Sequence, residues 1–181
     1  VFNETSMSRI WTRRSIRQYS RQPVSDDAIR QILKAAMSAP SAYDRRPWSF
    51  VVITDEQILR EIPRFHEYAI MLNAVGTAIA VCGVTSAVDT DEEWLAACSA
   101  ATQNMLLAAH ELGLGSVWVG ITPIERRVEK LKALLELPAG IEPLCVLPLG
   151  YPAEERHAED RYDESKVHMN RWSSSVANMD C

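Results

Sequence analysis

The chain has 181 residues, a formal net charge of −5 at pH 7 and a hydrophobic content of 47%. This size and composition predict one folded domain over residues 1–172, followed by a polar C-terminal tail over 173–181. The acidic balance argues against nucleic acid as a main partner, because binding to a phosphate backbone needs an extended basic surface.

Targeting and metal-binding signals are not found. The most apolar window, 69–84, is interrupted by polar residues, whereas a membrane span needs about 18 apolar residues in a row. Residues 1–6 lack the charged and apolar regions of a signal peptide. The four cysteines form no CxxC pair, and the four histidines have no ligand spacing. We therefore expect a cytoplasmic protein with no bound metal, no disulfide framework and no membrane partner.

The predicted elements alternate between helices and strands. Helices are expected over 8–14, 25–39, 54–65, 94–112 and 122–137, and strands over 50–53, 77–84, 116–120 and 143–149. The segment after 153 is polar and irregular. This order predicts an α+β fold, an α/β sandwich with a mixed central sheet flanked by helices.

Local signals define several helix ends. Ser25 is typical of an N-cap, and Gly113 is well placed as a C-terminal cap. Residues 54–57 and 122–125 each match a capping box. The long helix in between carries an apolar stripe that is nearly continuous around it, which indicates a central core or interface position. Cys82, Cys98 and Cys145 lie in apolar segments and are interpreted as small core residues.

Arginine is concentrated near the N-terminus. The arginine segment, residues 9–21, contains five arginines, and the chain has no Asp or Glu between Thr5 and Ser25. Arg13, Arg14 and Ser15 offer forked cationic donors together with a hydroxyl, which suits a phosphate monoester. The alternative is a solvated basic helix face that pairs with acids elsewhere in the chain.

A second unusual segment, residues 38–48, combines two prolines and several small residues with Tyr, Trp and two arginines. Small residues such as Ser41 and Ala42 permit a close backbone approach to a flat ligand. The alternative is an ordinary connection from a helix to a strand. Motifs for P-loop, Rossmann and α/β-hydrolase chemistry are missing from the sequence, so an enzyme of this kind would take its reactive atoms from a cofactor.

Five blocks in order resemble the nitroreductase family of flavoproteins. They are Arg13-Arg14-Ser15-Ile16-Arg17, the stretch from Ala39 to Trp48, Ala101 to Ala109, Leu112 to Gly120, and Leu147 to Pro152 with the late Arg161. The resemblance implies a central sheet of four to five strands, an intertwined homodimer, and FMN held between the two subunits.

The resemblance also implies site residues. Those expected to bind the cofactor are Arg13, Arg14, Ser15, Arg17, Pro40, Ser41, Ala42, Asp44, Trp118, Val119, Gly120 and Arg161. Arg13, Ser15 and Arg161 would meet the phosphate and ribityl end, and Arg17 the pyrimidine edge of the ring. Residues 40–42 would come from the partner subunit. Trp118, Val119 and Gly120 would line the ring, with a backbone N–H near flavin N5; no side chain is assigned as catalytic.

Some positions depart from the family pattern or invite a simpler interpretation. Asp44 and Arg46 stand where the family often has amides, so they would change flavin contacts or form a local salt bridge, and Ala97 replaces an acid. Gln103 and Asn104 are interpreted as structural, and Trp94 and Trp172 as packing or dimer contacts. These departures bear on the substrate rather than on the cofactor.

The function implied by the resemblance is that of an FMN-dependent oxidoreductase. It would take hydride from NADH or NADPH and reduce a small acceptor, such as a nitroaromatic or a quinone, in a ping-pong cycle. The alternatives are a flavin-binding or storage protein without turnover, and a specialised member that carries out dehalogenation or flavin fragmentation.

Overall fold

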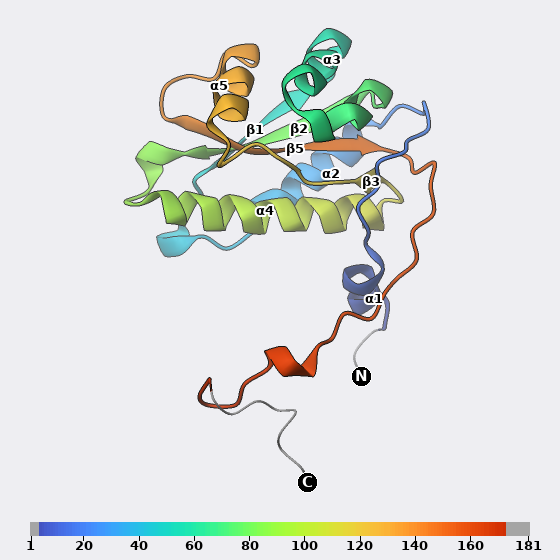
Figure 1. The fold of residues 1–181 in the computed structure, drawn as a ribbon, viewed down its shortest axis with the longest axis vertical. Helices are drawn as coiled ribbons and strands as arrows, with labels where there is room; N and C mark the ends of the chain where they lie inside the picture. Colours follow the sequence, from blue (N-terminus) through green and yellow to red (C-terminus); the bar gives the residue numbers. More distant parts are fainter. Residues whose placement is uncertain (1–3, 173–181) are drawn as a thin grey trace.

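A five-stranded sheet forms the centre of the structure, a computed structural model that describes residues 4–172 (Figure 1). The strands are β1 (Trp48–Ile53), β2 (Thr77–Val84), β3 (Gly115–Ser116), β4 (Val119–Gly120) and β5 (Ile141–Gly150). They are arranged in the order β1-β2-β5-β3, and β4 also pairs with β5. The long strand β5 therefore contacts three of the other four strands.

Helices cover both faces of this sheet (Figure 1). They are α1 (Glu4–Thr12), α2 (Asp26–Met37), α3 (Glu56–Phe65), α4 (Asp91–Glu111) and α5 (Glu125–Leu134), with short 3-10 turns η1 (Ala42–Asp44), η2 (Glu67–Ala74), η3 (Thr85–Ala87) and η4 (Glu164–Lys166). Helices α3 and α5 lie on one face, and α2 and α4 on the other. Helix α1 and the C-terminal segment project together from the body of the molecule.

The core consists of two apolar layers separated by the sheet. Because side chains of a strand alternate between faces, Ala78 and Ala80 of β2 pack toward α3 and α5, whereas Ile79 and Val81 pack toward α2 and α4. Every residue of β2 except the last is buried, which confirms the predicted doubly covered strand.

Helix α4 has the central position that its apolar stripe predicts. Its residues Cys98, Ala101 and Met105 are fully buried in the core layer that lies between the sheet and α2 and α4. Gly113 follows the helix with φ +73°, a left-handed conformation that favours glycine at a C-terminal cap. The cysteine prediction is also confirmed, since Cys82, Cys98 and Cys145 are free and buried.

The sheet differs from the expected mixed arrangement. All strand ladders are antiparallel, and a parallel pairing occurs only as an isolated bridge between Ser15 and Ser116 within the described residues 4–172. The register gives the reason. The last residue of β1, Ile53, pairs with Ala78 at the start of β2, so α3 and η2 connect two neighbouring strand ends at the same end of the sheet and β2 runs antiparallel to β1. The expected single strand 116–120 is split into β3 and β4, because Val117 and Trp118 leave the ladder.

Two predicted capping boxes are wrong. Asp55, not Thr54, caps α3, and its carboxylate accepts from the N–H groups of Gln57 and Ile58 at 2.7 and 3.3 Å. Helix α5 begins two residues later than expected, after Ile124 and without a side-chain cap, so Thr122 is not at its N-cap; the Thr122 hydroxyl instead donates to the Pro143 carbonyl at 2.7 Å. In both cases the helix begins later in the chain than the capping-box pattern predicts.

No helix within the described residues is long and apolar enough to span a membrane. The predicted tail, 173–181, and Cys181 within it, lie outside the described part of the chain.

The close approach of Gly83 to Trp94 gives a stability prediction. A Cβ at Gly83 would lie 2.2 Å from the Trp94 ring, which is itself buried and hydrogen-bonded to Asp91. Gly83→Ala is therefore expected to lower the free energy of unfolding by about 1–3 kcal/mol through overpacking, measured by urea denaturation. The matched control is Gly76→Ala, because a Cβ at Gly76 meets no atom within 4 Å. Equal stability of the two variants would contradict this packing.

Candidate functional site

The arginine segment is held against one end of the sheet by backbone pairing. The Ile16 N–H donates to the Ser116 carbonyl at 3.0 Å, and the Ser20 N–H donates to the Tyr151 carbonyl at 2.9 Å. Ile16 and Tyr19 are buried, so the residues between and before them are directed away from the core. Arg17 is exposed on the outer side of the segment, and Ser15 is half-buried.

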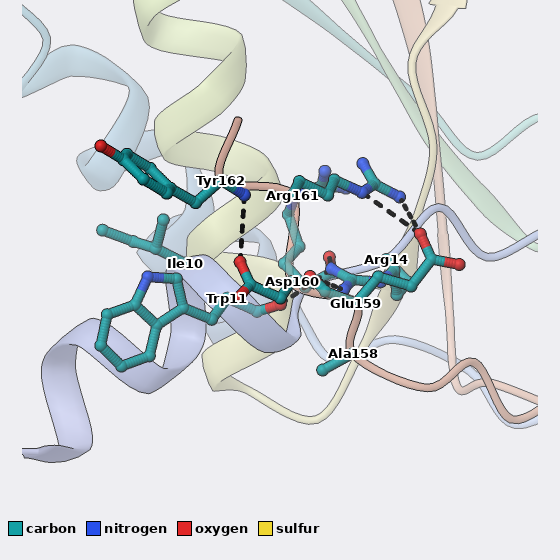
Figure 2. Close-up of a pocket in the computed structure, with 9 residues that line it drawn as sticks. Ile10, Trp11, Arg14, Ala158, Glu159, Asp160, Arg161 and Tyr162 are labelled. Carbon is teal, nitrogen blue, oxygen red and sulfur yellow. Dashed lines mark hydrogen bonds and ion pairs between the residues drawn. The ribbon is translucent and has the colours of Figure 1, made fainter. Parts of the chain in front are cut away.

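Arginines from both ends of the chain meet in two adjoining cavities. The outer cavity, about 640 Å³, lies between the end of α1 and residues 158–162, with Trp11 and Tyr162 on its apolar side (Figure 2). The arginine cavity, about 510 Å³, is lined by Arg13, Arg14, Ser15, Arg17, Glu155, Arg156, His157, Glu159 and Arg161. The predicted convergence of Arg13 and Arg161 is therefore present in the structure.

The arginine cavity carries an excess of positive charge. Five arginines line it against two glutamates. Partial burial, together with the charges of Arg14 and Arg161, lowers the pKa of Arg13. Within residues 4–172 the Arg13 guanidinium has no hydrogen bond or ion pair, whereas Arg161 pairs with Glu159 at 3.1 Å. Like charges held this closely are stabilised by an anion between them, and a phosphate matches the guanidinium geometry.

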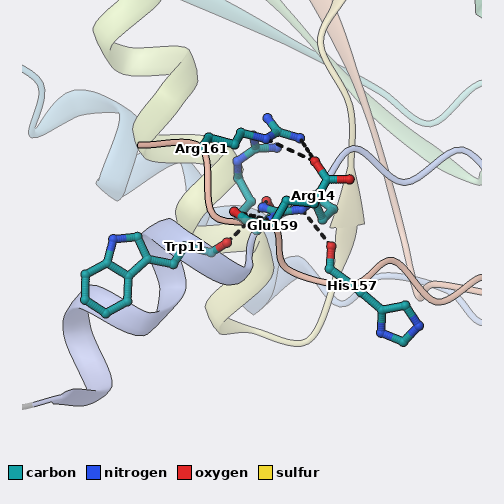
Figure 3. Close-up of polar contacts among 6 residues, drawn as sticks. Trp11, Arg14, His157, Glu159 and Arg161 are labelled. Atoms are coloured by element: carbon teal, nitrogen blue, oxygen red, sulfur yellow. Dashed lines mark hydrogen bonds and ion pairs between the residues drawn. The ribbon is translucent and has the colours of Figure 1, made fainter. Parts of the chain in front are cut away.

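Arg14 has a different role from its neighbours (Figure 3). Its guanidinium donates to four backbone carbonyls, those of Trp11 at 2.8 Å, Arg13 at 2.7 Å, His157 at 2.9 Å and Glu159 at 3.3 Å. With these donors engaged, Arg14 ties the end of α1 to the C-terminal segment. Arg14 therefore has a structural role; it also lines the arginine cavity, so its contact with the cofactor stays a prediction.

Glu154 fixes the other side of the arginine segment and was not predicted. Its carboxylate accepts from the backbone N–H groups of Arg17 at 2.6 Å and Gln18 at 3.2 Å, and from Arg156 at 2.8 Å. The hydrogen bond from the Arg17 N–H is the largest cause of a lowered pKa for this carboxyl group. In the sequence, Glu154 is recognisable only as an acidic residue shortly after Pro152. Acidic residues are so common in loops that this position alone does not predict a role for Glu154.

A third cavity of about 440 Å³, here called the edge cavity, contains the second group of predicted residues. It is lined by Arg17, His66, Glu67, Tyr68, Ile70, Met71, Val117, Trp118, Val119, Gly120 and Arg127. The structure thus brings Arg17 together with Trp118, Val119 and Gly120, as predicted. His66 and Arg127 were missed: His66 comes from a distant part of the chain, and Arg127, seven residues after Gly120, lies on α5, where an arginine has no distinguishing pattern.

Gly120 presents its backbone polar groups on the free side of β4. In an antiparallel ladder, successive residues face alternately toward and away from the partner strand. The Ile121 N–H donates to the Leu144 carbonyl of β5 at 3.0 Å, so the N–H and C=O of Gly120 face away from β5. The carbonyl contacts His66 Nε2 at 2.8 Å and accepts from Arg127 Nη1 at 3.4 Å.

The loop that carries Pro40, Ser41, Ala42 and Asp44 lies apart from these cavities, none of which it lines. Asp44 and Arg46 form the local salt bridge that was one of the two expected outcomes, with oxygen–nitrogen distances of 2.5 and 2.7 Å, and hydrogen bonding to Arg46 lowers the pKa of Asp44. Next to them, Arg45 ties the loop to the N-terminal end of α4 through Asp89 and Glu93.

Several side chains have the structural roles expected from the sequence. The amide of Asn104 donates to the Ala35 carbonyl at 3.0 Å and links α4 to α2. Trp94 is buried in the core, whereas Trp172 is exposed and stacks on His168. Ala97 is buried in α4.

The sequence matches the family model described as the Nitroreductase family over residues 10–82 and 70–151. The chain belongs to the Nitroreductase family. A protein from Methanothermobacter thermautotrophicus, assigned as an NADH dehydrogenase/NAD(P)H nitroreductase, is 45% identical over 90% of this chain and 85% of its own length. The sequence resemblance to this family, and the α+β fold expected from it, are therefore confirmed.

Solved structures of family members agree with the observed fold. A protein of the same assignment from Bacteroides thetaiotaomicron has a TM-score of 0.90 at 41% identity, covering 94% of this chain and 99% of its own. A protein from Desulfovibrio desulfuricans, described as a nitroreductase in complex with FMN, has a TM-score of 0.75 at 32% identity, covering 86% of this chain and 91% of its own.

The contacts of Arg14 predict how the C-terminal segment is anchored. Arg14→Ala removes charge-assisted hydrogen bonds to the carbonyls of His157 and Glu159, so hydrogen–deuterium exchange over 155–162 should become about tenfold faster. Arg13→Ala is the matched control, because the Arg13 side chain has no polar contact within residues 4–172. Similar exchange in the two variants would show that Arg14 does not anchor the segment.

Proposed function

We propose that this protein is an FMN-dependent oxidoreductase that takes electrons from NADH or NADPH and reduces small conjugated acceptors such as nitroaromatics and quinones. The observation that carries the proposal is the position of Arg17, which lines both the arginine cavity and the edge cavity. A cationic cavity and a cavity at a sheet edge thereby adjoin at Arg17, and this arrangement suits a ligand with a phosphate at one end and a flat ring at the other. The FMN complex of the related Desulfovibrio protein supports the choice of cofactor.

The residues present fit FMN on chemical grounds. Arg13, Ser15 and Arg161 supply forked cationic donors and a hydroxyl for the phosphate end. The outward-facing N–H of Gly120 is a donor for a ring nitrogen, and Arg17 places positive charge at the adjoining edge. When bound, FMN supplies the atom that accepts and releases hydride. The contribution of the protein is to bind the phosphate, orient the ring and stabilise negative charge on it.

We further propose that the active form is a homodimer in which a second copy supplies Pro40, Ser41, Ala42 and Asp44. Within one chain, this loop lines neither the arginine cavity nor the edge cavity. Several large apolar side chains are strongly exposed, namely Tyr43, Tyr68, Ile70, Tyr162 and Trp172. Of these, Tyr68 and Ile70 lie together beside the edge cavity, where a second copy would cover them.

The test of the cofactor proposal uses purified protein loaded with FMN. The protein should turn yellow, and NADH or NADPH should bleach the flavin absorbance under anaerobic conditions, after which a quinone or nitroaromatic should restore it. Protein that stays colourless after incubation with FMN would contradict the proposal. Yellow protein that neither nucleotide bleaches would instead identify a flavin-binding protein without turnover.

Arg13→Ala should weaken FMN binding about 10- to 100-fold, measured by quenching of flavin fluorescence, because one or more charge-assisted hydrogen bonds are lost. Raising the salt concentration should reduce the difference between wild type and variant. Arg21→Ala is the control, since Arg21 is exposed and lines none of the three cavities. If both substitutions weaken binding equally, the effect belongs to net charge rather than to a phosphate site.

A further inference from the structure

We infer that His66 and Arg127 are positioning residues, which together hold the Gly120 carbonyl so that the neighbouring Gly120 N–H is directed into the edge cavity. The inference rests on the proposed function, in which this N–H orients the flavin ring. Neither side chain needs to touch the cofactor for this role. Both act through the backbone of a third residue.

Gly120 is a position where the backbone needs external support. It ends a strand of two residues at the edge of the sheet, and its own polar groups face away from β5. A Cβ added to Gly120 would meet only ordinary contacts, at 3.8 Å or more from Trp118, so packing within the chain does not require glycine here. A glycine in an edge strand is typical of a close approach by another molecule, but it also leaves the backbone free to rotate.

His66 supplies that support from a buried position. His66 is only 3% exposed. Its backbone N–H donates to the Ile62 carbonyl and its carbonyl accepts from the Ala69 N–H, which fixes it between α3 and η2. Because a carbonyl only accepts, the proton must reside on Nε2, which lies 2.8 Å from the Gly120 oxygen. The other ring nitrogen, Nδ1, is buried and has no partner within the described residues. The tautomer is therefore determined by the Gly120 contact.

Arg127 reinforces the same carbonyl. Its Nη1 donates to the Gly120 oxygen at 3.4 Å, a longer and weaker bond than that of His66. Burial lowers the pKa of His66, and the nearby charge of Arg127 lowers it further, so the imidazole stays neutral near pH 7. Two donors from α5 and from the α3–η2 junction thus converge on one oxygen. Rotation of the Gly120–Ile121 peptide, which carries this oxygen, would break both hydrogen bonds, so the backbone of Gly120 and with it the N–H of the preceding peptide are held in place.

The first test needs no cofactor. Protein labelled with [15N]glycine contains seven glycines, and the amide signal of Gly120 is assigned by its loss in Gly120→Ala. In His66→Met the 15N order parameter of the Gly120 amide should fall below the value typical of a rigid backbone, because this residue loses the stronger of the two hydrogen bonds that hold its carbonyl. His66→Gln keeps an N–H donor at a similar reach and should remain close to wild type. If the Gly120 amide is equally ordered in the Met and Gln variants, the inference is wrong.

The second test uses the FMN-loaded protein. The rate constant for flavin reduction at saturating NAD(P)H should fall about 2- to 10-fold in His66→Met and recover in His66→Gln, while the dissociation constant for NAD(P)H stays unchanged. Arg127→Met, at a partly exposed position, should give a smaller change in the same direction and covers the case that His66→Met fails to fold. An unchanged rate in both Met variants would overturn the inference. Failure of wild-type protein to bind FMN would refute the proposed function instead, and the amide measurement would still decide the role of His66.

Discussion

The antiparallel pairing of β5 is the interaction on which the candidate site depends. This strand is buried over most of its length and hydrogen-bonds with β2 on one side and with β3 and β4 on the other. Its middle, at Cys145 and Val146, sets the position of Gly120. Its C-terminal end leads directly to Tyr151 and Pro152, which hold the arginine segment. One strand therefore fixes the separation between the edge cavity and the arginine cavity.

Glu154 and Arg14, two charged residues near the end of β5, hold the backbone of the arginine segment without neutralising its other arginines. Glu154 uses its carboxylate mainly on backbone N–H groups, and Arg14 uses its guanidinium on backbone carbonyls. These two ionised groups fix the arginine segment from opposite sides. Arg13 and Arg17 are left with no side-chain ion pair within the described residues, so positive charge is kept available beside both cavities. Such preorganised charge favours an anionic ligand over water.

Features encoded locally could be predicted from the sequence, and features that need tertiary contacts could not. The buried strand β2 and the helix α4 follow from their apolar patterns, and Ser25 caps α2 as its side chain suggests. The split of 116–120 into β3 and β4 depends on pairing with β5, which no local pattern encodes. His66 and Gly120 are 54 residues apart in the chain, so their contact leaves no spacing signal. Arg13 and Arg161 lie near opposite ends of the chain, and they were predicted together through family resemblance rather than through physics.

The loop at 41–46 is held in a conformation that its own residues disfavour. Tyr43, Asp44 and Arg46 all have positive φ, which for residues other than glycine costs on the order of 1 kcal/mol or more each. The Asp44–Arg46 salt bridge, the hydrogen bond from the Arg46 N–H to Ser41 Oγ and the anchoring of Arg45 on α4 offset this cost. Three sets of interactions thus stabilise a loop whose Tyr43 is 86% exposed and packs against no core. A strained and exposed loop of this kind is what the proposed homodimer would use, because the second copy would supply residues 40–44 to the site.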